Sequence, residues 1–163
     1  MDEELDELHW SYVEKSRAAA TPAGQAELLK ATLAQLTLAD IAAFDHWFWQ
    51  QMQLLYSWEL WGVASLAGHD GEEAFLGFRA WIVSLGRSPS LAAAADADSL
   101  AEFIFDGAEA PDFCHAGREA YEGKAGSELP TATLNLFAKP RGEPIQNSEL
   151  TTRFPGVSAA LSR

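Results

Sequence analysis

The sequence is poor in cysteine and in basic side chains, and each shortage argues against a class of protein. Cys114 is the only cysteine among 163 residues, so the chain forms no internal disulfide and suits a reducing, cytoplasmic compartment. The 11 Lys and Arg residues stand against 24 Asp and Glu residues, which gives a formal net charge of −13. Nucleic acids and anionic membrane surfaces are bound by clustered basic side chains, so we expect neither as a partner.

Several other signals are also missing. No apolar run approaches the roughly 20 residues of a membrane-spanning helix, and the acidic start at Met1-Asp2-Glu3-Glu4 is the opposite of a signal peptide. Phosphate-binding loops, dinucleotide fingerprints, nucleophile elbows and HExxH metal motifs are absent. The cluster from His69 to Glu73 leaves a mixed metal site open, but an acidic first helical turn explains it better. We therefore predict no cofactor and no metal.

What the sequence does contain is apolar side chains three and four residues apart, which is typical of helices. The length suits one domain with a substantial core. We predict an all-α fold, a compact bundle of about six helices around a long central helix at residues 38–67. The remaining predicted helices cover residues 3–20, 24–36, 71–85 and 111–123, with two weaker pieces at 91–97 and 98–105.

Cap residues indicate where several of these helices begin. Thr37 is placed to accept a backbone N–H at the start of the central helix, where Asp40 favours the positive helix end. Asp70 followed by Glu73 repeats this signature before the helix at 71–85. Asp98 is the predicted cap of the segment that follows it.

The composition changes after residue 130, where prolines become frequent and basic residues locally outnumber acidic ones. We predict a helical domain over residues 1–130 and a Pro-rich C-terminal tail over 131–163 that packs on the same domain. Arg141 or Arg153 should approach acidic side chains of residues 96–128. Because exposed ion pairs contribute little to stability, buried apolar side chains should supply most of the free energy that keeps the tail packed on the domain. The predicted side chains are Leu136, Phe137 and Phe154.

Arg79 is the most informative single residue, because its helical neighbours three and four positions away are all apolar: Phe75, Leu76, Ile82 and Val83. Such a cation either extends to water or pairs with a carboxylate from another element. Asp45 has the mirror arrangement, an acid among apolar neighbours. We predict that Arg79 pairs with Asp45 or Glu59; the other interpretation is that Arg79 anchors a ligand carboxylate or phosphate.

Aromatic side chains crowd the predicted central helix, where six fall within 15 residues: Trp47, Phe48, Trp49, Tyr56, Trp58 and Trp61. At 100° per residue they cannot share one helix face. Either the helix lies at the centre of the domain, or some of these side chains line a pocket or an interface. We expect at least one of Trp47 and Trp49 to be exposed or to line a cavity.

Two runs of residues resemble a known family: the stretch from Phe44-Asp45 to Tyr56-Ser57-Trp58-Glu59-Leu60-Trp61, and the more specific block Phe78-Arg79-Ala80-Trp81-Ile82. They are similar to a bacterial, mainly actinobacterial, domain-of-unknown-function family numbered 4240, over roughly residues 10–130. The resemblance implies a helical fold and no established activity. Family members are usually polar where this chain has Trp47 and Trp49, which implies a specialised partner or ligand.

Two functions of different classes are left open. The first is a non-catalytic binding domain that recognises a peptide, a protein segment or a small ligand, or forms a homodimer, through an aromatic and acidic helix surface. Its predicted ligand-binding residues are Trp47, Trp49, Tyr56, Trp61 and Arg79. The alternative is a small cofactor-independent enzyme of bacterial specialised metabolism, with carboxylate acid/base groups in an aromatic pocket. Its candidate catalytic residues are Asp45, Glu59, Glu73 and Tyr121.

Overall fold

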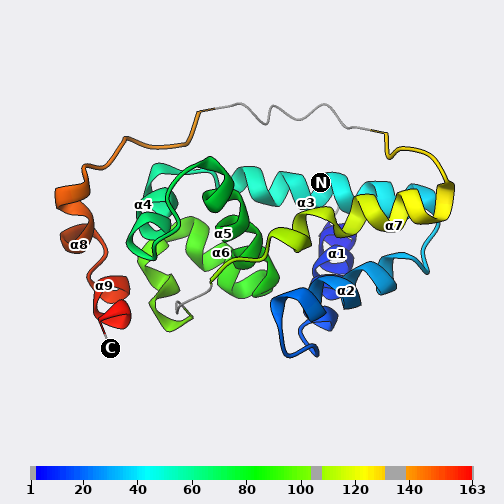
Figure 1. Ribbon diagram of the computed structural model, residues 1–163, viewed down its shortest axis with the longest axis horizontal. Helices are drawn as coiled ribbons and strands as arrows, with labels where there is room; N and C mark the ends of the chain where they lie inside the picture. Colours follow the sequence, from blue (N-terminus) through cyan, green and yellow to red (C-terminus); the bar gives the residue numbers. More distant parts are fainter. Residues whose placement is uncertain (1–2, 104–107, 131–138, 163) are drawn as a thin grey trace.

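Helices account for all the regular secondary structure within residues 3–103, 108–130 and 139–162, which are the residues that the computed structural model describes (Figure 1). The α-helices are α1 (Glu3–Ser16), α2 (Pro22–Leu33), α3 (Leu38–Leu54), α4 (Trp58–Leu66), α5 (Glu72–Ser84), α6 (Arg87–Ala95), α7 (Ala116–Ala125), α8 (Leu150–Arg153) and α9 (Pro155–Leu161). The 3-10 helices are η1 (Ala97–Glu102), η2 (Pro111–His115) and η3 (Asn147–Glu149). The predicted all-α fold is confirmed. No described helix combines the length and the apolar composition that crossing a bilayer demands.

Helices α3 and α5 supply much of the core. Its largest fully buried aromatic side chains are Trp10, Phe44, Trp47, Phe48, Phe75, Phe78 and Phe113. Burying each such side chain stabilises the fold by roughly 1.5–3 kcal/mol or more. Helix α7 packs on α3 and α2 at one end of the molecule, while α4, α8 and α9 lie at the other end (Figure 1).

The predicted central helix is wrong in one respect, because the chain leaves the helix between α3 and α4. Ser57 is extended there, with φ −137° and ψ 153°, and its side-chain oxygen accepts the Leu60 N–H at 3.1 Å. The Arg141 N–H donates to the Tyr56 carbonyl at 2.9 Å, and the Arg141 carbonyl accepts the Trp58 N–H at 3.0 Å. A capping serine and a distant partner segment end the helix, although the apolar periodicity continues.

Other helix starts follow the predictions in part. Thr37 accepts a backbone N–H at 3.2 Å and caps α3 as predicted. The predicted cap at Asp70 is wrong, since Gly71 is the N-cap residue of α5 and has φ 89°, a conformation that glycine adopts without a steric penalty. The predicted cap at Asp98 is also wrong, because Asp96 accepts the N–H that caps η1.

The C-terminal helices α8 and α9 pack on α4 and η1. Phe154 is 3% exposed and lies with Leu150 against Gly62 of α4, where an added β-carbon would be 2.9 Å from a Leu150 methyl carbon. The small residue on α4 therefore allows close contact with the chain that follows α8. The other two predicted anchors, Leu136 and Phe137, lie outside the described residues.

The polar contacts of these last helices differ from the prediction. Arg153 pairs with Glu59 of α4 at 3.2 Å, and Glu59 is outside residues 96–128. The Arg141 guanidinium donates to the last carbonyl of α3. Within residues 96–128, Asp98 contacts α9, where it accepts two backbone N–H groups of the first turn at 3.0 and 2.8 Å. A carboxylate capping a helix from another element takes the place of the expected ion pair.

Candidate functional site

A groove of about 790 Å³ opens where α1, α3 and α6 meet the segment that precedes α8. We call it the glutamine groove and define it by its lining residues: Glu3, Asp6, Trp10, Gln50, Gln51, Gln53, Leu54, Tyr56, Leu91, Lys139 and Arg141. The first three come from one side of α1, and the next four come from the last turn and a half of α3. The site therefore depends on segments that are far apart in the sequence.

Apolar side chains form part of the groove wall. Leu54 at the end of α3 and Leu91 on α6 are 50% and 48% exposed, which is high for large aliphatic side chains. Trp10 and Tyr56 lie deeper and are buried. Trp10 is held edge-to-face against Trp47, with ring centroids 4.8 Å apart. Exposed leucines beside fixed aromatic rings suit contact with an apolar group of a ligand.

Three amide side chains enter the groove from the end of α3: Gln50, Gln51 and Gln53. Gln51 is 7% exposed. The Gln50 Oε1 atom is buried and has no hydrogen-bond partner within the described parts of the chain. A buried acceptor without a donor costs about 1–3 kcal/mol. A ligand N–H would remove that cost if the Gln50 side chain turned its oxygen toward the groove.

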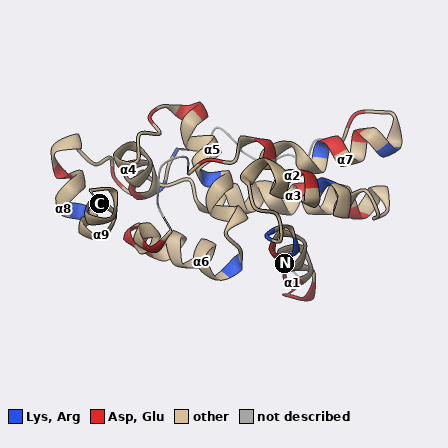
Figure 2. Ribbon diagram, turned by 60° about the horizontal axis from the view of Figure 1, so that its bottom comes forward, with Lys and Arg blue, Asp and Glu red and all other residues tan. Residues whose placement is uncertain are grey.

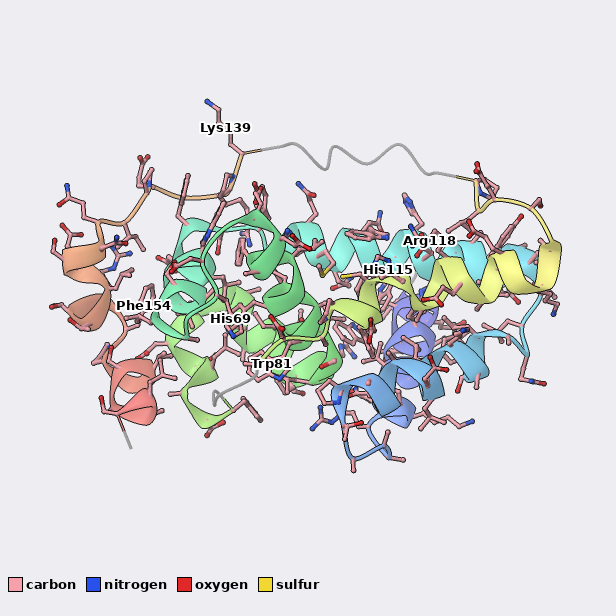
Figure 3. All side chains as sticks on the ribbon, in the orientation of Figure 1. His69, Trp81, His115, Arg118, Lys139 and Phe154 are labelled. Atoms are coloured by element: carbon pink, nitrogen blue, oxygen red, sulfur yellow. The ribbon has the colours of Figure 1, made fainter. Side chains whose placement is uncertain are left out.

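The segment before α8 forms one edge of the groove. Arg141 is fixed there by its backbone pairing on either side of Ser57. Its guanidinium also donates to the Leu54 carbonyl, which satisfies an acceptor left free at the end of α3. Lys139 is exposed, and its side chain extends away from the helices (Figure 3). The two cations of this edge thus differ: one is anchored and the other projects into solvent.

Arg79 of α5 contacts Tyr56, one of the residues that line the groove, and is 8% exposed. Its Cζ atom is 4.6 Å from the Tyr56 ring centroid and 4.8 Å from the Phe75 ring centroid. Its Nη1 donates to the Met52 carbonyl at 2.9 Å, while its Nε has no partner among the described residues. Two aromatic faces and a carbonyl thus surround the buried cation.

The predicted ion pair of Arg79 with Asp45 or Glu59 is wrong. Glu59 pairs with Arg153, and Asp45 faces α7. Burial lowers the pKa of Arg79, and the negative charge of Glu72 opposes that shift. The Arg79 side chain packs on Tyr56, which lines the groove, but Arg79 itself does not line it.

The Tyr56 hydroxyl donates to Glu72 Oε1 at 2.8 Å and so ties the groove wall to the first turn of α5. Burial and this hydrogen bond raise the pKa of Tyr56. The phenol therefore stays protonated at neutral pH, where it acts as a donor and not as a base.

The comparisons with known proteins identify a family. Residues 1–123 match the family described as Protein of unknown function (DUF4240). The chain belongs to the DUF4240 family. No curated protein and no solved structure matches the chain. The DUF4240 region supplies every lining residue of the glutamine groove except Lys139 and Arg141.

The structure separates the residues predicted to bind a ligand. Tyr56 is the one that lines the glutamine groove. Trp47 belongs to the core and is 1% exposed, because α3 is covered on that side by α1. Trp49 is half-buried, as is Trp61, which stacks on Phe75 with centroids 4.8 Å apart. Thus the aromatic run serves mainly the core, with Trp49 and Trp61 at its surface.

The glutamines and leucines of the groove are absent from the predicted site. The run Gln50-Gln51-Met52-Gln53-Leu54 carries a signal, because it places three amides and an aliphatic side chain in the last turns of one helix. Leu91 and Arg141 carry no comparable local signal. Their places in the site result from tertiary packing alone.

The candidate catalytic residues lie in different environments, and none of them lines the glutamine groove. Asp45 packs against Gly117 of α7. Glu59 forms an exposed ion pair on α4, and Glu73 lies in the acidic first turn of α5. Tyr121 is half-buried on α7.

Asp45 has an unusual carboxyl group. Burial raises its pKa to about 6, although the charge of Arg118 and a hydrogen bond from Trp49 oppose the shift. Arg118 itself lies beside His115, with Nη2 and Nδ1 3.2 Å apart (Figure 3). A carboxyl with this pKa changes its charge near neutral pH, and here it does so at the contact between α3 and α7.

Cys114 is buried, and burial raises the pKa of its thiol to about 12. The thiol is therefore protonated at neutral pH, whereas nucleophilic attack and metal binding need the thiolate. In the three described ranges, no group of three or more His, Cys, Asp or Glu side chains is arranged to hold a metal ion.

Proposed function

We propose that this chain is a non-catalytic binding domain and that the glutamine groove holds an extended peptide segment with an apolar side chain near its centre. The groove volume of about 790 Å³ falls within the roughly 300–1,000 Å³ that is typical of ligand sites. The half-exposed Leu54 and Leu91 would contact the apolar side chain of the peptide.

The three amide side chains at the end of α3, beside the two half-exposed leucines, are the observation that carries this proposal. The Gln50 Oε1 atom has no donor within the described residues, so a turn of this side chain toward a ligand breaks no hydrogen bond to that oxygen. Glutamine side chains offer both a donor and an acceptor, as a peptide backbone does. Three such amides on one helix end can therefore pair with N–H and C=O groups of successive peptide units, which an apolar small molecule cannot provide.

No observation favours the enzyme alternative over this proposal. An acid/base mechanism needs its carboxylates beside the substrate. The candidates Asp45, Glu59 and Glu73 do not line the groove, and the Tyr56 phenol that does is bonded to Glu72.

The test is selection of a random-sequence peptide library displayed on phage against the full chain. Peptides enriched on the wild-type protein should bind Leu91→Asp at least about tenfold more weakly, because a charge in the apolar wall opposes the apolar side chain. Leu8→Asp is the matched control, since Leu8 is 46% exposed on α1 and does not line the groove. The selected peptides should bind that variant as they bind the wild type.

A nuclear magnetic resonance titration with one selected peptide places the contact. The side-chain NH₂ resonances of Gln50 should shift on binding. Failure to enrich any peptide, or equal binding to wild type and Leu91→Asp, would contradict the proposal. A doubling of mass in light scattering that Leu91→Asp abolishes would assign the groove to a second copy of the chain and overturn the peptide assignment.

A further inference from the structure

The glutamine groove carries four charged lining residues, and they come from two different segments. Glu3 and Asp6 lie in the first turn of α1, where acidic positions cluster (Figure 2). Lys139 and Arg141 come from the segment before α8. All other lining residues are uncharged.

Two hydrogen bonds attach one residue of each end to α3. Asp6 Oδ1 accepts the Trp47 Nε1–H at 2.8 Å, and the Arg141 guanidinium donates to the Leu54 carbonyl. Trp47 and Leu54 are separated along α3 by a distance of about 10 Å, at about 1.5 Å per residue. An extended peptide advances about 3.3 Å per residue, so roughly three residues span the same distance.

One charge at each end is free to meet a ligand. Asp6 and Arg141 are held by the bonds just described, and they set the geometry of the two ends. Glu3 and Lys139 are exposed, and neither side chain has a hydrogen bond or ion pair within the described residues. A side chain of opposite charge could approach each of them without displacing a protein partner.

We propose that the groove selects a dipolar peptide, with a basic side chain at the Glu3 end and an acidic side chain or terminal carboxylate at the Lys139 end. This inference rests on the proposed function and names the ligand class for the same site. Complementary charges at both ends favour this pattern over a peptide with two like charges, because a like charge at either end is repelled.

The basic end lies beyond the part of the chain that matches DUF4240, whereas Glu3 and Asp6 lie within it. We therefore expect Lys139, which lies outside the matched residues, to bind the acidic end of the peptide. Arg141 is a positioning residue for that end, because its backbone and guanidinium hold the segment against α3 and the Ser57 bridge.

The test uses three capped peptides with one leucine and two charges: Ala-Lys-Leu-Ala-Glu-Ala, Ala-Lys-Leu-Ala-Lys-Ala and Ala-Glu-Leu-Ala-Glu-Ala. Each is titrated into the full chain in about 150 mM salt, where charges act over only about 8 Å and the net charge of the chain is largely screened, and the Gln50 NH₂ resonances are followed. Wild type should bind the Lys/Glu peptide about two- to fivefold more tightly than either like-charged peptide. Lys139→Glu should shift the preference to the dilysine peptide, and Glu3→Lys should shift it to the diglutamate peptide.

Lys15→Glu separates local recognition from the attraction of the whole acidic chain. It changes the net charge as Lys139→Glu does, but Lys15 is exposed near the other end of α1 and does not line the groove. If both variants shift the three affinities equally, or if wild type binds the three peptides equally, the charge selection is overturned while the peptide groove stands. If no peptide moves the Gln50 resonances even at millimolar concentration, the result counts against the proposed function itself.

Discussion

A β-carbon placed on Gly117 would lie 2.8 Å from Asp45 Oδ1 and 3.0 Å from Asp45 Cβ, so the glycine of α7 fits directly over the carboxyl of α3. The absent side chain lets the two helices approach closely. That approach removes water from the carboxyl, and burial raises the pKa of Asp45 to about 6. The same contact therefore sets both the helix spacing and the ionisation of Asp45.

The stability of the protein should depend on pH through Asp45. The pKa rises from 3.8 to about 6 on folding, so between these values the folded state holds a proton that the unfolded state has released. Stability from this group is thus lost as pH rises from about 4 to about 6. Asp45→Asn should abolish that loss. The free energy of unfolding of Asp45→Asn minus that of wild type should therefore be about 2 kcal/mol larger at pH 7 than at pH 4, allowing for the water that still reaches the side chain.

Urea unfolding of wild type and Asp45→Asn at several pH values measures this difference. Asp112→Asn is the control, because Asp112 is exposed on η2 and the chemical change is the same. A difference between wild type and Asp45→Asn that stays constant from pH 4 to pH 7 would show that Asp45 is not the group responsible.

Gly117→Ala should destabilise the protein by about 1 kcal/mol. Overpacking costs about 1–3 kcal/mol, and the better helix propensity of alanine returns about 1 kcal/mol. Gly123→Ala on the same helix is the control, since a β-carbon there meets nothing within 4 Å. That variant should be stabilised by up to about 1 kcal/mol. Equal effects of the two substitutions in thermal unfolding would contradict the close contact.

The helical class could be predicted from the sequence because apolar spacing, Thr37 and the turn glycines all act locally. The break between α3 and α4 could not, because it depends on Arg141, which pairs with the backbone beside Ser57 from 84 residues along the chain. Local periodicity cannot detect such a partner. The same limitation explains why Asp98, which caps α9 from η1, is predicted as the cap of its own segment.

The candidate site was harder to predict than the fold, for a related reason. Tyr56 is the predicted ligand residue that does line the groove, and its neighbours there come from α1, α6 and the segment before α8. The sequence shows Arg79 as a cation on an apolar helix face, but the partner predicted for it is wrong. Its partners are aromatic rings and the Met52 carbonyl, and neither kind of partner is distinguishable from ordinary core residues in one sequence.

Substitutions of Arg79 should separate the effect of its volume from that of its charge. Arg79→Ala should cost about 2–4 kcal/mol, because it leaves a cavity behind Tyr56 and removes the donor to the Met52 carbonyl. Arg79→Met keeps most of the volume and removes a buried charge that has no ion-pair partner among the described residues, so it should cost clearly less. Urea unfolding measures both values, and an equal loss in the two variants would contradict this account of the site.

Asp98 should control how firmly the last helix is held. Its carboxylate accepts the N–H groups of Gly156 and Val157 at 3.0 and 2.8 Å, so it satisfies donors that the start of α9 would otherwise leave free. Asp98→Ala should weaken this attachment by about 1–2 kcal/mol. Amide hydrogen exchange in residues 150–161 should then become about 5- to 30-fold faster, provided that these amides exchange by local opening.

Glu102→Ala tests whether the faster hydrogen exchange comes from losing the two hydrogen bonds of Asp98 or from losing any negative charge on η1. Glu102 is exposed on the same 3-10 helix, and its side chain has no hydrogen bond or ion pair within the described residues. Exchange in α8 and α9 should remain at the wild-type rate in this variant. Because α9 also packs on η1 and Phe154 is buried, Asp98→Ala should leave the helices docked most of the time. Unchanged exchange in Asp98→Ala would mean that apolar packing alone holds α9, and that the two hydrogen bonds add little to its stability.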